Sequence, residues 1–333
     1  MLEKTEYGQM VPQVSVIVPV YNALPYFDQC LRSLKKQTLE NIQVILVDDG
    51  STDGSSHVCD YVARDDSRFS VIHQKNSGQA IARNVGIDQA RADYLMFVDA
   101  DDYIGVDCCR RAYESVTKES ADVGVFCFRR LPESATHTLK HGPIEGVKTR
   151  DKALELMTIG DVGSNIWNKI FAKQLFQDIR FPPNRVFEDQ ATTCKLIEKA
   201  NKVVFIDKQL YFYRDNPHST VNLSGATWEH RAKTYHDGFI ATMEFNNCLQ
   251  RHGISPDQHD NSRFMAWQAL LYCLFHVSQY QGKLYKQAVQ MLKDTRIRRG
   301  LGFKVVCAML IARFNSTMFV FCCLIFEKFF KKR

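Results

Sequence analysis

The sequence lacks the cysteine patterns that mark metal-binding or disulfide-stabilised domains. Its eleven cysteines are scattered over 333 residues, with no Cys-X-X-Cys pair and no cysteine–histidine cluster at ligand spacing. Residues 1–13 are polar and contain no apolar run, so we expect no signal peptide. Reduced and mostly buried thiols in the cytosol are therefore the expected state of the cysteines.

A surplus of positive charge is also missing from most of the chain. The formal net charge is +6, but nine of the 43 basic residues and only one of the 37 acidic residues lie from Arg296 onward. Residues 1–295 therefore carry 34 basic and 36 acidic side chains, a net charge of −2. A nearly neutral body with a basic tail argues against nucleic acid as a partner and favours a local basic anchor.

No glycine-rich phosphate-binding loop follows the first apolar run. Residues 20–24 read VYNAL, which matches neither GxGxxG nor GxxxxGK[ST]. This absence excludes a dinucleotide-dependent oxidoreductase. It also argues against a nucleotidyltransferase, which stays the alternative among nucleotide-binding α/β enzymes.

Short apolar runs alternate with segments of helical spacing through the first half of the chain. The runs are residues 14–18, 44–47, 70–72, 94–98 and 123–128. Their alternation at intervals of roughly 25 residues is typical of an α/β fold with a mostly parallel, Rossmann-like sheet. Because the runs are apolar at nearly every residue, we expect helices on both faces of this sheet.

The second half of the chain changes character. Helices are predicted near residues 151–159 and 189–200, and short strands at residues 203–206 and 210–213. Beyond Trp228 the pattern is helical to the end. We therefore expect the sheet to be followed by a helical C-terminal region.

Polar side chains follow four consecutive predicted strands at their carboxyl ends, where ligands bind in sheets of this kind. These segments are residues 19–22 (PVYN), 48–53 (DDGSTD), 73–84 (HQKNSGQAIARN) and 99–102 (DADD). Taken singly, they are also explained by turns, helix caps and solvated helix residues. The last one is harder to explain in this way, because three carboxylates within four residues repel one another unless a cation compensates their charge. It predicts a Mg²⁺ or Mn²⁺ site that also binds a diphosphate.

Four segments in this order resemble the motifs of a known enzyme family, the inverting family 2 glycosyltransferases with their GT-A fold. They are residues 16–22 (VIVPVYN), 47–53 (VDDGSTD), 78–86 (GQAIARNVG) and 97–102 (FVDADD). The resemblance extends to about residue 220 and fades beyond it. It implies transfer of a hexose or N-acetylhexosamine from a UDP-sugar to a glycan, with Mn²⁺ or Mg²⁺ as the cofactor.

The resemblance also implies roles for residues on the donor side. Tyr21 would stack on the uracil, and Arg83 would lie near the base and the diphosphate. Asp99 would reach the donor ribose. The full donor set is Pro19, Tyr21, Asp49, Arg83, Asp99 and Asp101, and the metal would be held by Asp101 or Asp102, which the sequence does not separate.

On the acceptor side, the resemblance implies a general base within the pair Glu188 and Asp189. We predict Asp189 as the base, with Glu188 as the second choice. Two acids at a helix N-terminus are also explained by the helix dipole alone. Weaker matches near the acceptor and diphosphate are Trp167, Asn168, Lys169, Arg214 and His218, of which Trp167 is equally explained as a core residue and His218 as a loop residue.

The same resemblance suggests a division of the chain. A GT-A catalytic domain would span residues 1–222, with a nucleotide-binding part at 14–130 and an acceptor and base part at 131–222. A helical region, residues 223–295, and a basic, apolar tail, residues 296–333, would follow.

The tail contains two apolar blocks, residues 305–312 and 318–326, each shorter than the ~20 residues of a membrane-spanning helix. We expect helices that lie in the membrane interface with basic side chains toward anionic lipid. The alternative is a helical hairpin packed on its own protein.

Together with the tail, the resemblance implies a role in assembly of a bacterial surface polysaccharide, such as a capsule, O-antigen or exopolysaccharide. The enzyme would be peripheral on the cytoplasmic side of the cell membrane, with a lipid-linked glycan as the acceptor, and a homo-oligomer is left open. The non-enzymatic alternative is a degenerate homologue that acts as a membrane-bound scaffold. The intact acid pairs argue against it.

Overall fold

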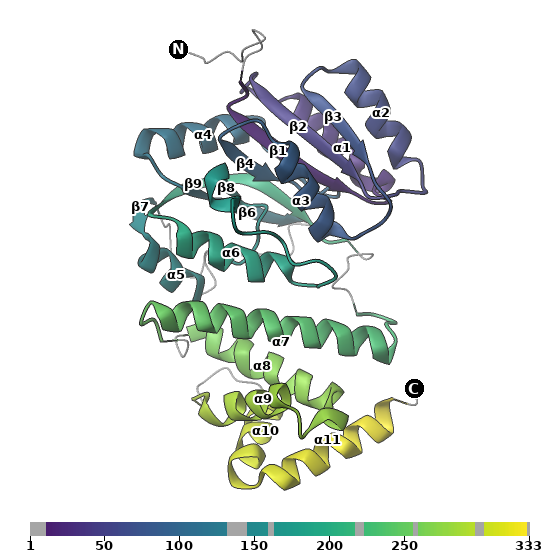
Figure 1. The fold of residues 1–333 in the computed structure, drawn as a ribbon, viewed down its shortest axis with the longest axis vertical. Helices are drawn as coiled ribbons and strands as arrows, with labels where there is room; N and C mark the ends of the chain where they lie inside the picture. Colours follow the sequence, from purple (N-terminus) through teal and green to yellow (C-terminus); the bar gives the residue numbers. More distant parts are fainter. Residues whose placement is uncertain are drawn as a thin grey trace. The chain divides into compact units, whose positions relative to one another are not determined.

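The computed structural model describes residues 11–131, 145–158, 163–216, 223–255, 259–296 and 303–331. The chain forms two compact units. The sheet unit consists of Met1–Leu154 and Asp161–Pro217, and the helical unit consists of Glu155–Gly160 and His218–Arg333. Figure 1 shows the sheet with its helices and the set of helices that follows it in the chain.

The sheet has nine strands within the described residues, in the order β3-β2-β1-β4-β8-β6-β9-β5, with β7 beside β9. The strands are β1 (Val14–Val20), β2 (Ile42–Asp48), β3 (Phe69–His73), β4 (Tyr94–Phe97), β5 (Tyr103–Ile104), β6 (Val123–Leu131), β7 (Gly146–Thr149), β8 (Lys169–Ala172) and β9 (Lys202–Arg214). The first four are parallel, which confirms the Rossmann-like half of the prediction. β8 then enters antiparallel to both β4 and β6, so the sheet becomes mixed.

Helices cover both faces of this sheet, as predicted (Figure 1). Those of the sheet unit are α1 (Leu24–Lys35), α2 (Ser55–Asp65), α3 (Gln79–Gln89), α4 (Cys108–Glu119) and α6 (Glu188–Lys199), while α5 (Arg150–Thr158) crosses the boundary between the units. Buried residues of α1, α2 and α4 share one core with Val16 and Val18 of β1. Ile17, which lies between them in β1, faces the opposite side of the sheet and packs against α3. A Cβ added at Gly86 of α3 would lie 2.3 Å from the Ile17 side chain. Glycine at position 86 therefore lets α3 approach the sheet closely.

The acceptor half differs in detail from its prediction. The two short strands expected at residues 203–206 and 210–213 form the single strand β9, whose pairing with β6 shifts in register around Cys127. The strands β5, β7 and β8 were not predicted. β8 matters most, because it links the parallel half of the sheet to β6 and β9.

The helical unit has its own core, formed by the helices predicted after Trp228. They are α7 (Trp228–Arg251), α8 (His259–Phe275), α9 (Lys283–Asp294), α10 (Phe303–Phe314) and α11 (Ser316–Phe330). Val305 and Met309 of α10 and Phe319 of α11 are buried in one cluster with residues of α8 and α9. One side of the tail thus packs on its own protein, as the alternative reading expected. Among the described residues, no helix combines the length and apolar character needed to cross a bilayer.

Candidate active site

The predicted motifs meet at one edge of the sheet. Val20 of β1 pairs with Asp48 of β2, and Ile17 pairs with Phe97 of β4. Because these strands are parallel and nearly level, the segments that follow them emerge side by side. Tyr21, Asp49 and Asp99 therefore lie at the same edge.

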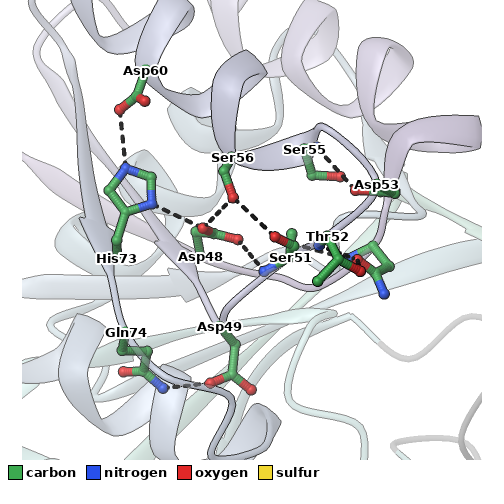
Figure 2. A network of polar contacts seen from close by, with 11 residues as sticks. Asp48, Asp49, Ser51, Thr52, Asp53, Ser55, Ser56, Asp60, His73 and Gln74 are labelled. Carbon is green, nitrogen blue, oxygen red and sulfur yellow. Dashed lines mark hydrogen bonds and ion pairs between the residues drawn. The ribbon is translucent and has the colours of Figure 1, made fainter.

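Asp49 connects the loops that follow β2 and β3. Its carboxylate accepts hydrogen bonds from Gln74 Nε2 (2.7 Å) and from the backbone amides of Ser77 and Gly78 (both 2.8 Å), and Figure 2 shows the Gln74 contact. Gly50 beside it has a φ of +76°, and a Cβ there would lie 2.9 Å from the Asn76 amide. A side chain at position 50 would thus be strained and would clash with backbone, so glycine is required where the two loops approach each other.

A second network fixes the start of the DDGSTD loop (Figure 2). Asp48 accepts hydrogen bonds from the Ser56 hydroxyl (2.6 Å) and the Ser51 amide (3.1 Å) and contacts His73 Nδ1 (2.8 Å), while His73 Nε2 contacts Asp60 (3.0 Å). Burial alone would raise the pKa of Asp48, but these hydrogen bonds outweigh it and hold the pKa below its ordinary value. Hydrogen bonds to Asp48 and Asp60 raise the pKa of His73. The loop is therefore held in place by charge-assisted contacts.

Tyr21 and Pro19 differ in accessibility. Pro19 is buried within β1, whereas 52% of the Tyr21 surface is exposed just beyond the strand. Asn22, at a positive φ of 48°, accepts a hydrogen bond from the Thr52 amide (2.8 Å) and so ties this turn to the DDGSTD loop. The Tyr21 ring is thus presented to solvent on a fixed turn, as a stacking face requires.

Arg83 joins three of the predicted site segments. The residue is 2% exposed, and its guanidinium donates to Asp99 Oδ1 (2.8 Å) and to Glu188 Oε1 (2.7 Å). Gln79 Nε2 also donates to Asp99 Oδ1 (3.0 Å). Burial alone would lower the pKa of Arg83, but the neighbouring carboxylates of Asp99, Glu188 and Asp189 raise it. The bridge holds α3, the segment after β4 and the start of α6 together.

The two acids that compete for the metal role occupy different environments. Asp102 is 1% exposed and accepts hydrogen bonds from the Tyr211 hydroxyl and the Arg214 amide, both at 2.7 Å. Burial, followed by the charges of Asp99 and Asp101, raises its pKa to about 9. Both of its oxygens are thus engaged with β9. This geometry argues against the predicted role of Asp102 as a metal ligand.

Asp101 is only partly buried, and its Oδ2 accepts a hydrogen bond from Asn216 Nδ2 (2.9 Å). Burial and the charge of Asp99 raise its pKa. Across the described part of the chain, no three or more His, Cys, Asp or Glu side chains are grouped so that they hold a metal ion by themselves. A cation at Asp101 would therefore need further oxygen ligands from a substrate.

Asp189, the predicted base, and its neighbour Glu188 also have different partners. Both open α6, after Phe187 at a positive φ of 61°. The Glu188 carboxylate pairs with Arg83, while Asp189 accepts a hydrogen bond from the Gln190 amide (2.7 Å). Burial and the charge of Glu188 raise the pKa of Asp189, against a lowering by Arg83. A raised carboxylate pKa is typical of a general base.

The weaker acceptor-side candidates are mostly buried. Trp167 belongs to the core and stacks on Tyr211, with ring centroids 4.4 Å apart, as its alternative reading expected. Asn168 is buried and donates to the Phe126 carbonyl (3.1 Å). Lys169 is also buried, at the start of β8. Burial of these three side chains argues against direct contact with an acceptor.

Arg214 lies at the end of β9 with its guanidinium 4.8 Å from the centre of the Tyr26 ring, and it donates to Gln29. It is half-buried, and its backbone amide donates to Asp102, so it lies next to the acidic segment. His218 lies outside the described residues.

Sequence reasoning overlooked the residues that hold the site acids in place. They are Gln74, Gln79, Tyr211 and Asn216. Gln79 stands inside the GQAIARNVG segment, so the motif contained its signal. Tyr211 in β9 and Asn216, two residues after β9 ends, are distant in sequence from the acids and carried no local signal.

Comparisons with known proteins agree with this geometry. The family model described as glycosyl transferase family 2 matches residues 15–181. The chain belongs to glycosyl transferase family 2. One relative, the uncharacterized glycosyltransferase EpsJ of Bacillus subtilis, is 34% identical over 240 residues, which covers 68% of each chain. Glycosyltransferase GlyG of Streptococcus pneumoniae is 34% identical over 211 residues, 60% of this chain and 70% of the relative.

Solved structures support the GT-A fold. The family 2 chain aligns with S. aureus TarS 1–349 in complex with UDP-GlcNAc at a TM-score of 0.62 and 20% identity, over 96% of this chain and 92% of that chain. Mannosyltransferase PcManGT from Pyrobaculum calidifontis aligns at a TM-score of 0.54 and 14% identity, over 97% and 88% of the two chains. At these identities the likeness concerns the fold alone.

Proposed function

We propose that this family 2 protein transfers a sugar from a UDP-sugar to a glycan acceptor with inversion at the anomeric carbon. The observation that carries the proposal is the Arg83 bridge. One buried guanidinium binds Asp99 of the DxD segment and Glu188 of the predicted base pair. Residues that are 105 positions apart in sequence thus form one charged cluster at the ligand-binding edge of the sheet.

On the donor side, the exposed ring of Tyr21 stacks on the uracil. Asp49 holds the loop of residues 74–78 that forms the wall of the nucleotide site. We take a UDP-hexose or UDP-N-acetylhexosamine as the proposed donor class; the TarS structure of similar fold is a complex with UDP-GlcNAc.

The chemistry of Asp101 fits a divalent cation. Its carboxylate is a hard oxygen ligand that would hold Mn²⁺ or Mg²⁺ together with oxygens of the diphosphate and of water. We assign the metal role to Asp101, because both oxygens of Asp102 are held by β9. When bound, the cation offsets the negative charge that develops on the leaving diphosphate.

On the acceptor side, we assign the general base to Asp189. Its carboxylate removes the proton from the acceptor hydroxyl while that oxygen attacks the anomeric carbon. The bond to the diphosphate oxygen breaks on the opposite face of the sugar, which inverts the anomeric centre. Glu188 is paired with Arg83 and so positions this part of α6.

The exposed surface of the tail supports the proposed acceptor class. One side of α10 and α11 is buried, and the other side exposes large apolar residues: Phe303, Leu310, Phe314, Met318, Phe321, Leu324, Ile325 and Phe330. Lys304, Arg313 and Lys328 are exposed on the same two helices. An apolar face with basic residues suits the anionic cytoplasmic leaflet of the cell membrane. A lipid-linked glycan of a bacterial surface polysaccharide is an acceptor available at that surface.

Replacement of Asp101 by Ala is expected to remove metal-dependent donor binding. Wild-type protein should bind UDP at least about tenfold more tightly with Mn²⁺ than without it, a difference of ~1.4 kcal/mol. Calorimetric titration of UDP with and without Mn²⁺ measures this difference for wild type, Asp101→Ala and the control Asp65→Ala. Asp65 is a surface acid that pairs with Lys35. Equal Mn²⁺ dependence in wild type and Asp101→Ala would reject Asp101 as the ligand.

The double variant Phe314→Glu/Phe321→Glu is expected to bind anionic vesicles at least about tenfold more weakly than wild type, because it removes apolar surface and adds repulsion. Phe314 is 85% exposed, so its replacement leaves the core of the helical unit intact. Sedimentation with phosphatidylglycerol vesicles measures binding, and Tyr61→Glu, at an exposed aromatic of α2, is the control. Unchanged sedimentation, or a loss of dimers instead, would show that this face has another partner.

A further inference from the structure

Lys169 lies at the edge of the sheet that carries the candidate site. β8 runs antiparallel to β4, and Ile170 pairs with Met96. Continuing this register by one residue places Lys169 level with Phe97, two residues before Asp99. On its other side Lys169 pairs with Val125 of β6. Lys169 therefore lies on a central strand of the sheet, at the end of that strand nearest the candidate site.

The side chain also lies on the face of the sheet that carries the base. Met96 and Ile170 belong to the core shared with α1, α2 and α4. Side chains alternate along a strand, so Phe97 and Lys169 face the opposite side. Phe97 packs there against Phe181, whose ring lies under the guanidinium of Arg83. Arg83 in turn pairs with Glu188, next to Asp189. Lys169 thus lies on the same face of the sheet, and at the same edge, as the charged cluster.

All the hydrogens of the Lys169 ammonium have acceptors. The side chain is 0% exposed, and Nζ donates to Asn165 O (2.6 Å), Asn168 Oδ1 (2.7 Å) and Gly163 O (3.3 Å). The Asn168 amide is itself bound to the Phe126 carbonyl. The ammonium thus fastens the segment of residues 163–168 to the central strands.

The charge of Lys169 is matched to its surroundings. Burial lowers its pKa to about 7, and the charge of Asp189 counteracts this lowering. Asp189 faces Glu188 and Asp99, which raise its pKa, and Arg83, which lowers it. Because Arg83 is already shared between Glu188 and Asp99, a second positive charge helps to keep Asp189 ionised.

We infer that Lys169 is a positioning residue for the base: its buried ammonium fixes residues 163–168 at the site edge and favours the ionised form of Asp189. The inference rests on the proposed function of Asp189. Lys169 itself touches neither donor nor acceptor. It acts by fixing the segment of residues 163–168 and by stabilising the negative charge of Asp189.

The test is the pH profile of sugar transfer by Lys169→Met, with Lys169→Arg and Lys173→Met beside it. Loss of the positive charge should move the acid limb of kcat upward by about one pH unit, because Asp189 then takes up a proton more readily. Lys169→Arg should keep the wild-type acid limb, whatever its total activity, because a guanidinium stays charged. Lys173, at the other end of β8, donates to the Ala90 carbonyl (2.6 Å), so Lys173→Met controls for the loss of a lysine–carbonyl contact.

An acid limb at the wild-type position in Lys169→Met would overturn the inference and leave Lys169 a merely structural lysine. If that variant does not fold, Lys169→Arg decides alone. Its basic limb should move upward, since deprotonation of Lys169 would set that limb in the wild type, and an unmoved limb contradicts the inference. Calorimetric titration of the wild type with UDP tests the proposed function separately. Absence of UDP binding would contradict the proposed function, but it would not contradict the role of Lys169 within the fold.

Discussion

Asp189→Asn is expected to abolish sugar transfer and to leave UDP binding unchanged. Asparagine has nearly the same shape as aspartate but cannot accept the proton of the acceptor hydroxyl, and loss of a general base lowers a rate by about 10²–10⁴-fold. UDP needs no base, so its dissociation constant should stay within about twofold of wild type. Transfer from a panel of UDP-sugars and titration with UDP measure the two quantities on the same preparation.

The control for this variant is Asp178→Asn. Asp178 is an exposed acid that pairs with Lys199 at the end of α6. The control therefore removes an acid that contacts the same helix but lies outside the candidate site. It should keep full transfer activity. Transfer by Asp189→Asn at the wild-type rate would remove Asp189 as the base and direct attention to Glu188.

The pH dependence of transfer follows from the same residue. Burial and Glu188 raise the pKa of Asp189, so its base form is lost as the pH falls through a value above ~3.9, the ordinary aspartate pKa. The acid limb of the wild-type profile is thus expected above the range of an exposed aspartate.

Arg83→Met is expected to lower the free energy of unfolding by about 3–5 kcal/mol, because it leaves two acids, Asp99 and Glu188, without their buried cation. Methionine keeps much of the volume of the side chain, so the loss reports the charge. Urea denaturation followed by circular dichroism measures it. UDP binding should weaken together with stability, since the bridge joins both halves of the site.

The matched control is Arg180→Met. Arg180 pairs with Asp88 in solvent, where an ion pair contributes about 0–1 kcal/mol. A loss below about 1 kcal/mol in Arg83→Met as well would mean that the two acids find other partners. The bridge would then no longer carry the proposed convergence of the site.

The parallel half of the fold was predictable because most of its strands are buried on both faces. Such strands are apolar at nearly every residue, as β1, β2 and β4 are, whereas the edge strand β3 is only partly buried. In a parallel sheet, the carboxyl ends must share one edge. The polar residues after each run could therefore be placed together without knowing a single contact.

The mixed half was not predictable in the same way. β8 has only four residues, begins with a lysine, and is a strand because β4 and β6 lie on either side of it. β9 merges two predicted strands because its pairing with β6 continues across a shift in register. Short segments of this kind take their structure from their neighbours rather than from their own pattern.

The acids of the DADD segment likewise show what the sequence predicts and what it does not. Nothing in the letters DADD distinguishes Asp101 from Asp102. Tyr211 and Arg214, more than 100 positions away, engage both oxygens of Asp102 and leave Asp101 partly exposed. Which carboxylate a distant strand binds is decided only when that strand is in place.

The sequence by itself determined the fold class of the first half, the family, and the edge of the sheet at which the acids gather, because these follow from burial patterns and from short motifs within single segments. The tertiary structure alone decided that Arg83 joins Asp99 to Glu188, that Asp102 is held by β9, and that Lys169 is buried at the start of β8. These are contacts between segments far apart in the chain. Their strength depends on distance and on exclusion of water, and neither quantity is written in the local order of residues.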